Sequence, residues 1–244
     1  MREYPGKRRR RNGQRALPDA ALTFASQWQW PVVPGAGLEP QRRSSRRDRT
    51  HELTQDLTQD RTREPARPRE RECACPYPEC AAPGAHPYDP GVLAATTDPR
   101  MVRWWWEQQP DAPVLLATGG FAPSAVSLPA VTAARALTRL DRLGVRTGPV
   151  VATPERWALL VASYGYEELG ELLGEHGWVP ASLGFHGEGG YLALPPSETG
   201  AGRVRWERAP RPHGRAPWLP PVASVVGVLV EAVAAAPGGG RFVG

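Results

Sequence analysis

Cysteine is scarce in this chain: its 244 residues include three, all of them between Cys73 and Cys80. An odd number of cysteines in one short stretch does not build the paired framework of a disulfide-rich protein. Long apolar runs are lacking as well. The segment "VASVVGVLVEAVAAA" is too short to span a membrane and carries Glu231 in its middle, while "ALTFASQWQWPVV" is interrupted by Gln27 and Gln29 and has no signal-peptide core. We therefore expect a cytoplasmic protein without membrane attachment, whose thiols stay reduced.

Net positive charge is concentrated at the N-terminus. Residues 1–15 contain seven basic side chains and one acidic one, which gives this arm a charge of +6, and subtracting it from the total of +5 leaves the remainder near −1. Such an arm can neutralise phosphates without sequence preference, but a body near neutrality lacks the saturated basic groove of a dedicated nucleic-acid binder. The alternatives for the arm are a solubilising tail or a wrongly assigned start codon.

Glycine and proline together make up about a fifth of the chain, which predicts many loops. The segment 41–72 holds ten arginines and a tandem "LTQD" but almost nothing to bury, so it cannot recover its ordering entropy. We expect a disordered basic arm at 1–17, one domain at 18–236 interrupted by a disordered insertion at 41–72, and a flexible tail at 237–244.

Local patterns predict the elements before and after the insertion. A helix starts at Pro18 and is followed by a strand at 30–35. Asp98 and Pro99 begin a helix that carries three consecutive tryptophans, "WWW", at 104–106. Because these point in three directions, at most two can be core, and the third is either a partly exposed structural side chain or a base-stacking platform.

The second half alternates strands and helices, which predicts an α+β fold. We expect strands at 125–129, 148–153, 157–162, 190–196 and 203–207, and helices at 131–144, 166–177 and 222–233. In the helix at 131–144, the residues Val131, Ala134, Leu137 and Leu140 are expected on one buried face. The order β-α-β-β-α-β with an extra strand is the split βαβ arrangement of ferredoxin-like folds, with the last helix packed across the sheet.

The cysteine cluster predicts a metal site. Cys73, Cys75, Cys80 and His86 are spaced C-x-C-x4-C-x5-H and offer three thiolates and one imidazole, a set that suits structural Zn²⁺ in a closed tetrahedral site. If zinc belongs there, the four ligand atoms should lie within roughly 4 Å of one another. The alternative is that Cys73 and Cys75 are free thiols and that "PGAHP" is a simple turn.

Four motifs occur in an order that resembles a known family. These are "WPVVPG", "CACPYPECAAPGAHP", "TTDPRMVRWWWEQQPDAPVLLATG" and "HGEGGYLALPPS". Together they resemble the N-terminal primase-polymerase domain of bifunctional DNA primase/polymerases, in particular the short stand-alone actinobacterial type. The resemblance covers residues 18–236 without the insertion. It implies an RRM-like (ferredoxin-like) sheet with flanking helices and a Cys-rich loop, and a nucleotidyltransferase that extends DNA with divalent metal.

The resemblance also implies nucleotide contacts in the motif "HGEGGYLALPPS". His186 would touch a phosphate or a base, and Gly189 and Gly190 would let a nucleotide approach the backbone; the alternatives are a solvent-facing histidine and a plain hairpin. Ser197 lies where active relatives bind triphosphate, although Thr199 stands in place of their histidine. The expected partners are nucleotides and single-stranded DNA.

The catalytic positions depart from the family. Where active members carry acids, this sequence has Ser124, Ser127 and Gly184, and the hairpin "TPERWALLV" has no histidine; Glu188 is the one carboxylate nearby. Without convergent acids, Mg²⁺ or Mn²⁺ has no hard oxygen ligands. We therefore predict a nucleotide- or nucleic-acid-binding protein that has lost catalysis. The alternatives are an active primase/polymerase using Mg²⁺ or Mn²⁺ with its acids elsewhere, and an accessory protein without a nucleotide role.

Overall fold

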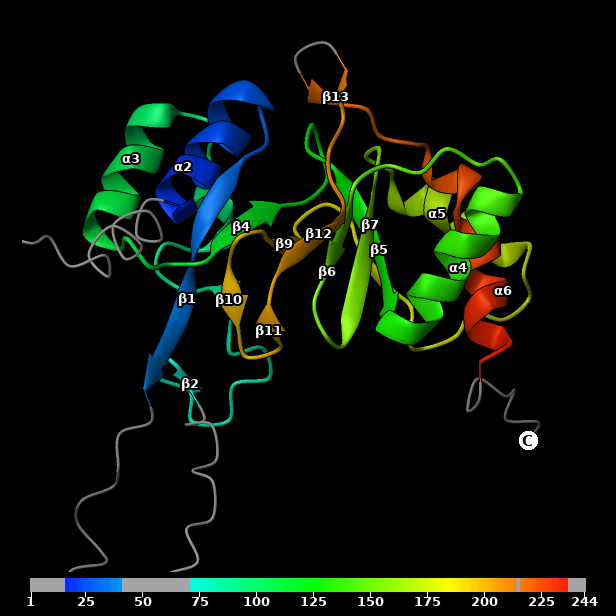
Figure 1. Ribbon diagram of the computed structural model, residues 1–244, viewed down its shortest axis with the longest axis horizontal. Helices are drawn as coiled ribbons and strands as arrows, with labels where there is room; N and C mark the ends of the chain where they lie inside the picture. The colour runs from blue at the N-terminus through cyan, green and yellow to red at the C-terminus, as the bar shows by residue number, and fades with distance from the viewer. Residues whose placement is uncertain (1–15, 41–70, 214–215, 237–244) are drawn as a thin grey trace, which may run out of the picture.

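A computed structural model describes residues 16–40, 71–213 and 216–236, and the predicted arm, most of the insertion and the tail lie outside these ranges. Within them the fold is mixed α+β, with five α-helices and two antiparallel five-stranded sheets (Figure 1). Two segment ends differ from the expected limits. Residues 16–17 already belong to a helix, and Arg71 and Glu72 belong to a strand.

The first sheet contains the N-terminal strands and has the order β2-β1-β4-β9, with β3 also paired to β1. Its strands are β1 (Val32–Pro40), β2 (Arg71–Cys73), β3 (Gly84–Pro87), β4 (Val114–Ala117) and β9 (Tyr191–Leu194). The first residues of β1 pair with β4, and its last three pair with β2. The long strand β1 therefore connects the body of the sheet to the segment that carries the cysteines.

Two helices pack with this sheet, α2 (Ala16–Leu22) and α3 (Pro99–Gln108). Helix α3 begins as predicted, because the Asp98 carboxylate accepts a hydrogen bond from the Arg100 N–H at 2.8 Å. Trp105 and Trp106 are buried, whereas Trp104 is 55% exposed. This confirms that two of the three tryptophans belong to the core.

The second sheet has the order β12-β6-β7-β5-β8. Its strands are β5 (Ser124–Pro129), β6 (Val150–Ala152), β7 (Arg156–Val161), β8 (Gly184–His186) and β12 (Arg205–Arg208). The prediction for residues 190–196 placed them in this sheet and was wrong. The short strand β8 pairs with β5 instead, and β9 pairs with β4 in the first sheet.

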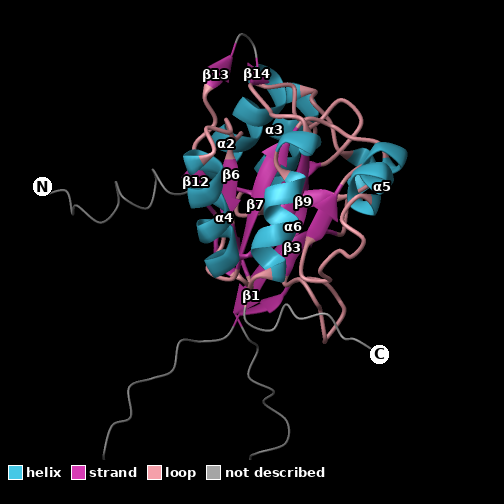
Figure 2. Ribbon diagram, turned by 90° about the vertical axis from the view of Figure 1, so that its right-hand side faces the viewer, coloured by secondary structure: helices cyan, strands magenta, loops and turns pink. Residues whose placement is uncertain are grey.

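Helices α4 (Ala130–Arg142) and α6 (Val226–Ala234) cover one face of the second sheet, and Figure 2 shows them side by side in front of the strands. An ion pair between Arg139 and Glu231 joins them. The predicted packing of the last helix across the sheet is confirmed, since Val226, Leu229, Val230 and Val233 of α6 are buried in this layer. In α4 the buried residues are Thr132, Ala133, Ala136, Leu137 and Leu140.

Val131 is 68% exposed, so its predicted place on the buried face is wrong; Ala134 is only partly buried, and Leu137 and Leu140 are buried as predicted. The buried face of α4 begins at the next residue, Thr132, and Val131 points away from it because consecutive helical residues point in different directions. The opposite face of the second sheet packs toward the first sheet, and side chains of both sheets and of α2 and α3 form one apolar cluster there.

The remaining elements are short or lie at the edges. They are η1 (Thr23–Gln27), η2 (Val92–Ala94), α5 (Tyr166–Gly174), β10 (Glu198–Thr199), β11 (Gly202–Arg203), β13 (Pro212–His213), β14 (Ala216–Pro217) and η3 (Val222–Ser224). Among the described residues, no helix combines the length and the apolar character needed to cross a bilayer.

Candidate functional site

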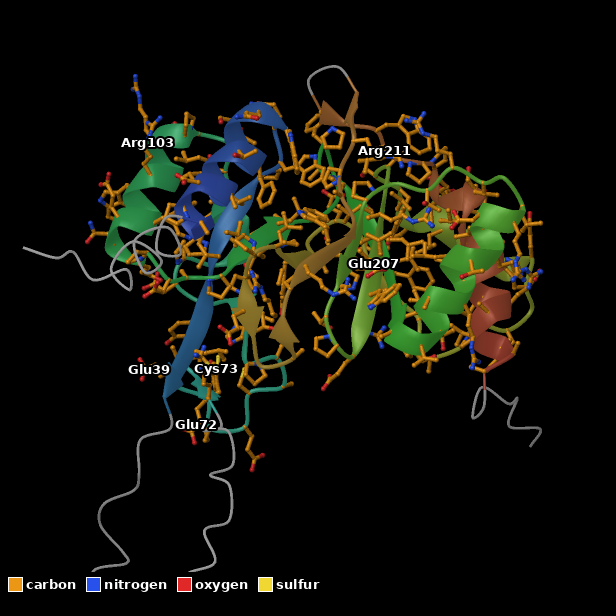
Figure 3. All side chains as sticks on the ribbon, viewed as in Figure 1. Glu39, Glu72, Cys73, Arg103, Glu207 and Arg211 are labelled. Carbon is orange, nitrogen blue, oxygen red and sulfur yellow. The ribbon has the colours of Figure 1, made fainter. Side chains whose placement is uncertain are left out.

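The four predicted metal ligands meet at the outer end of β1. Cys73 ends β2 and His86 lies in β3, and both strands pair with β1, which brings the two ends of the cysteine segment together. Figure 3 shows Cys73 near Glu39 and Glu72 at this end of the strand. Antiparallel pairing to a shared strand therefore closes the loop without any help from a disulfide.

The ligand atoms of Cys73, Cys75, Cys80 and His86 all lie within 4.8 Å of one another. The closest recorded pair is Cys73 Sγ and His86 Nε2 at 3.3 Å. Tetrahedral zinc with ordinary Zn–S and Zn–N bonds holds its ligand atoms about 3.6–3.8 Å apart. The cluster converges as predicted but is about 1 Å wider than the expected limit of roughly 4 Å.

Hydrogen bonds around the cysteine cluster orient its candidate metal-binding atoms toward a common centre. His86 Nδ1 lies 3.1 Å from the Pro87 carbonyl oxygen, which suits an Nδ1–H donor and leaves the Nε2 lone pair facing Cys73. The Gly84 N–H donates to Cys73 Sγ at 3.2 Å. Such backbone donors stabilise a thiolate, the form that binds metal.

The thiols differ in acidity. Burial raises the pKa of Cys73, but hydrogen bonds from the Gly84 and Cys75 backbone and from His86 outweigh this effect and bring the pKa to about 7. Burial and the neighbouring thiols Cys73 and Cys75 raise the pKa of Cys80 to about 11. A soft set of three sulfurs and one imidazole with one thiol already acidic could hold a metal such as zinc.

A second polar group lies where β5, β7 and β8 meet. Ser127 pairs in register with Gly184, and the His186 Nε2 is 3.0 Å from Ser127 Oγ. From the start of β7, Arg156 Nη2 donates to the Ser127 carbonyl at 3.0 Å, to the Ser182 carbonyl at 2.8 Å and to Ser127 Oγ at 3.2 Å. We call Ser127, Arg156 and His186 the strand-end cluster.

The strand-end cluster combines one positively charged side chain with two neutral ones. Burial lowers the pKa of His186, and the charge of Arg156 lowers it further, so the imidazole stays neutral near pH 7. Burial also lowers the pKa of Arg156 from a very high value, which leaves it charged. Among the described residues no carboxylate is recorded as a partner of Arg156. This arrangement suits an anion better than a cation.

Gly184 permits the close approach of these side chains. A Cβ at this position would lie 2.7 Å from Ser127 Oγ and 3.4 Å from Arg156 Nη2. Any side chain there would therefore displace the contact between the serine and the arginine.

The glycine-rich turn after β8 is fixed by packing against the end of β4. Thr118 Oγ1 donates to the Gly187 carbonyl at 2.7 Å, and the Gly190 N–H donates to the same carbonyl at 3.1 Å. Gly189 is exposed and has φ +77°, which favours glycine. Gly189 and Gly190 follow His186 by three and four residues, in this turn.

Comparison of the chain with models of protein families gives a match. The model described as "Bifunctional DNA primase/polymerase, N-terminal" (Prim-Pol) matches residues 21–219. The chain belongs to the Prim-Pol family. Searches of curated proteins and of solved structures return no match. Membership suggests a primase- or polymerase-related function and implies interaction with nucleotides or nucleic acid.

The divalent metals that Prim-Pol membership implies do not fit the strand-end cluster. Among the residues that the structure describes, the one group of three or more convergent Cys, His, Asp or Glu side chains is the cysteine cluster. Glu188 is exposed, and its recorded contact is made by its backbone carbonyl, which accepts a hydrogen bond from the Tyr166 hydroxyl at 2.9 Å. The serines and the glycine supply no carboxylate for Mg²⁺ or Mn²⁺.

The hydrogen bonds of Ser197 are made with residues outside the glycine turn. Its side chain is fully buried, and its hydroxyl accepts a hydrogen bond from the Val114 N–H at 2.8 Å, at the start of β4. The contact supports the first sheet of this Prim-Pol domain. A role of Ser197 in nucleotide binding stays a prediction.

Arg156 is the residue that sequence reasoning missed. It lies at the start of β7, in the hairpin that lacks the histidine of the family. Its position could have been noticed, because Arg156 shares the alternation of Ala158 and Leu160, which both face the inter-sheet layer. An arginine in phase with buried residues needs a polar partner, and here it finds one in Ser127.

Proposed function

We propose that this Prim-Pol protein binds nucleotides or single-stranded nucleic acid and does not catalyse polymerisation. One observation carries the proposal: the strand-end cluster places a guanidinium, a neutral imidazole and a serine together with no carboxylate. The succession β5-α4-β6-β7-α5-β8 and the spatial order β6-β7-β5-β8 support an RRM-like, ferredoxin-like sheet as the platform.

The chemistry of phosphoryl transfer supports the loss of catalysis. Two-metal transfer needs carboxylates that hold both ions on the reacting phosphate. The family resemblance would place acids at Ser124, Ser127 and Gly184, and a side chain at Gly184 does not fit beside Ser127 and Arg156. A fixed positive charge at this point would also repel a divalent cation.

The same charge favours a phosphate. Arg156 uses Nη2 for its three contacts with backbone and serine oxygens, and among the described residues no partner is recorded for its Nε and Nη1 donors. A guanidinium with free donors next to a neutral imidazole can bind phosphate oxygens without metal. We assign the adjoining contacts to His186, Gly189 and Gly190, where a nucleotide could approach the backbone.

The first experiment is nucleotide titration by calorimetry with chelator and again with Mn²⁺. We expect binding to persist without metal, because the charge that recognises the phosphate belongs to the protein. Arg156→Ala should weaken binding about tenfold or more, whereas Arg103→Ala on α3 should not. Absence of nucleotide and nucleic-acid binding under both conditions would favour the accessory-protein alternative.

The second experiment measures catalysis directly. Primer extension and primer synthesis with labelled nucleotides should both be undetectable with Mg²⁺ or Mn²⁺, since no acid pair is available at the strand-end cluster. Robust incorporation that disappears in Glu188→Gln would show instead that the protein is an active polymerase with its acids elsewhere.

We further propose that the cysteine cluster holds structural zinc. The support is its donor set and the convergence of four ligand atoms within 4.8 Å. His86→Asn should reduce bound zinc from one equivalent to none. It should also lower the melting temperature, because the two ends of the loop would no longer be held by one metal ion. His176→Asn is the matched control and should keep its zinc. Wild-type protein without stoichiometric zinc by elemental analysis would contradict this assignment.

A further inference from the structure

A groove of about 750 Å³ lies at the β12 edge of the second sheet, three strands away from Ser127 in the order β12-β6-β7-β5. With strands spaced about 4.8 Å apart, this separates it from the strand-end cluster by roughly 14 Å. It runs between the C-terminal end of α4 and the segment that follows β12. Its polar lining includes Asp141, Arg146, Thr147, Arg208, Arg211 and Trp218.

Part of the charge in this groove is already neutralised. The guanidinium of Arg208 hydrogen-bonds Thr147 Oγ1 and forms an ion pair with Asp141. Glu207, which also lines the groove, is paired with Arg205. These contacts hold the end of β12 against the turn after α4, so the groove has a rigid frame.

Two arginines that line the groove, Arg146 and Arg211, have no such ion-pair partners among the described residues. The guanidinium carbon of Arg146 lies over the Trp218 ring, 4.0 Å from its centroid, which is a cation–π contact. Figure 3 shows Arg211 on the same side of the molecule as Glu207, far from Arg103 on α3.

We propose that this groove binds one or two unpaired nucleotides of a single-stranded nucleic acid. Unstacked bases are recognised on aromatic and guanidinium planes, and Arg146 held over the Trp218 ring supplies both kinds of group at one point of the groove. Arg211 would bind the adjoining phosphate. The volume suits a ligand of this size. A duplex does not offer unstacked bases, so it would not fill the site.

The inference rests on the proposed function, namely that the protein binds nucleotides or nucleic acid, and adds the surface on which a strand lies. Its test uses the full chain and short fluorescent oligothymidylate, oligouridylate and abasic strands, measured by anisotropy at several salt concentrations. The DNA and RNA arms distinguish the two sources of the same chemistry.

The variants separate stacking from charge. Arg146→Ala and Arg146→Lys should each weaken binding of the base-bearing strands about tenfold and change binding of the abasic strand little, because both remove the guanidinium plane. Arg211→Ala should weaken all strands and reduce the salt slope by about one phosphate contact. Arg103→Ala, an exposed arginine on another helix, is the control and should leave every affinity unchanged.

Photocrosslinking locates the strand independently of affinity. A strand carrying 4-thiothymidine should crosslink to peptides that contain Thr147 or Trp218. Crosslinks confined to other segments, together with unchanged affinities in the Arg146 and Arg211 variants, would overturn the groove while leaving nucleic-acid binding intact. Equal weakening of the base-bearing and abasic strands by Arg146→Ala would overturn base recognition. Wild-type protein that binds no strand at all would overturn this inference, and the proposed function as well if nucleotides also fail to bind.

Discussion

Ser124 and Ser197 are both fully buried hydroxyls, yet their surroundings differ in one respect. Among the described residues, Ser124 Oγ has no hydrogen-bond partner, whereas Ser197 Oγ accepts a hydrogen bond from the Val114 N–H at 2.8 Å. An unsatisfied buried hydroxyl costs stability, and so does a backbone donor that loses its acceptor. The two serines should therefore respond oppositely to removal of the hydroxyl.

We predict that Ser124→Ala raises the free energy of unfolding by about 1 kcal/mol, because it removes an unpaired polar atom from the core. Ser197→Ala should lower it by about 1–3 kcal/mol, because the buried Val114 N–H is left unpaired. Urea denaturation of both variants measures the two changes. A loss of stability in Ser124→Ala would indicate that its hydroxyl has a partner in solution, such as a bound water.

The residues of the two clusters also differ in how far the sequence could predict them. The cysteine cluster spans few residues, so its spacing alone indicated the ligand set. The strand-end cluster combines residues from three strands, and its composition depends on the register of β5 with β7 and β8. Ser127 and His186 were found from the motif order, but Arg156 joins them only through cross-strand pairing.

At the level of elements, the junction between β4 and the glycine turn connects the two sheets. Gly119 follows β4 with φ +86°, and a Cβ there would lie 2.4 Å from the backbone of Glu188. Its neighbour Gly120 has φ +62°, but a Cβ there would meet nothing within 4 Å. The close approach at Gly119 is what allows the turn after β8 to rest on the end of β4.

We predict that Gly119→Ala lowers the free energy of unfolding by about 3 kcal/mol or more, because backbone strain and a backbone clash add together. Gly120→Ala is the matched control and should cost about 1 kcal/mol from the positive φ alone. Thermal and urea unfolding of the pair provide the comparison. Equal losses in the two variants would mean that the turn moves away from β4 at little cost.

Local signals account for the elements that were predicted correctly. Helix α3 was recognisable from Asp98 and Pro99, which act within one turn, and the last helix from its regular apolar face. Strand β8 has three residues and no alternation long enough to detect. The pattern of β9 indicated a strand but could not show which sheet it joins, because that choice depends on pairing with the distant strand β4.

At the scale of the whole molecule, charge is divided between the arm and the body. Residues 1–15 carry +6 and the remainder is near −1, so long-range attraction of nucleic acid is expected to come from the arm. The groove contributes two arginines and the strand-end cluster one, and in the part of the chain that the structure describes none of the three forms an ion pair. The arm would thus supply affinity that depends on salt, and the folded surfaces would supply contacts that depend on the geometry of the ligand.

We predict that deleting residues 1–15 weakens binding of a short single-stranded DNA and flattens its salt dependence, because each lost phosphate contact reduces the slope of log affinity against log salt by about 0.7. Anisotropy titrations between about 50 and 200 mM salt measure both quantities. A control that keeps the length of the arm but changes Lys7, Arg8, Arg9, Arg10 and Arg11 to glutamine should behave like the deletion, since charge and not length is responsible. If the truncated protein keeps the affinity and slope of the full chain, the folded body carries the binding surface alone, and the arm has no part in recognition.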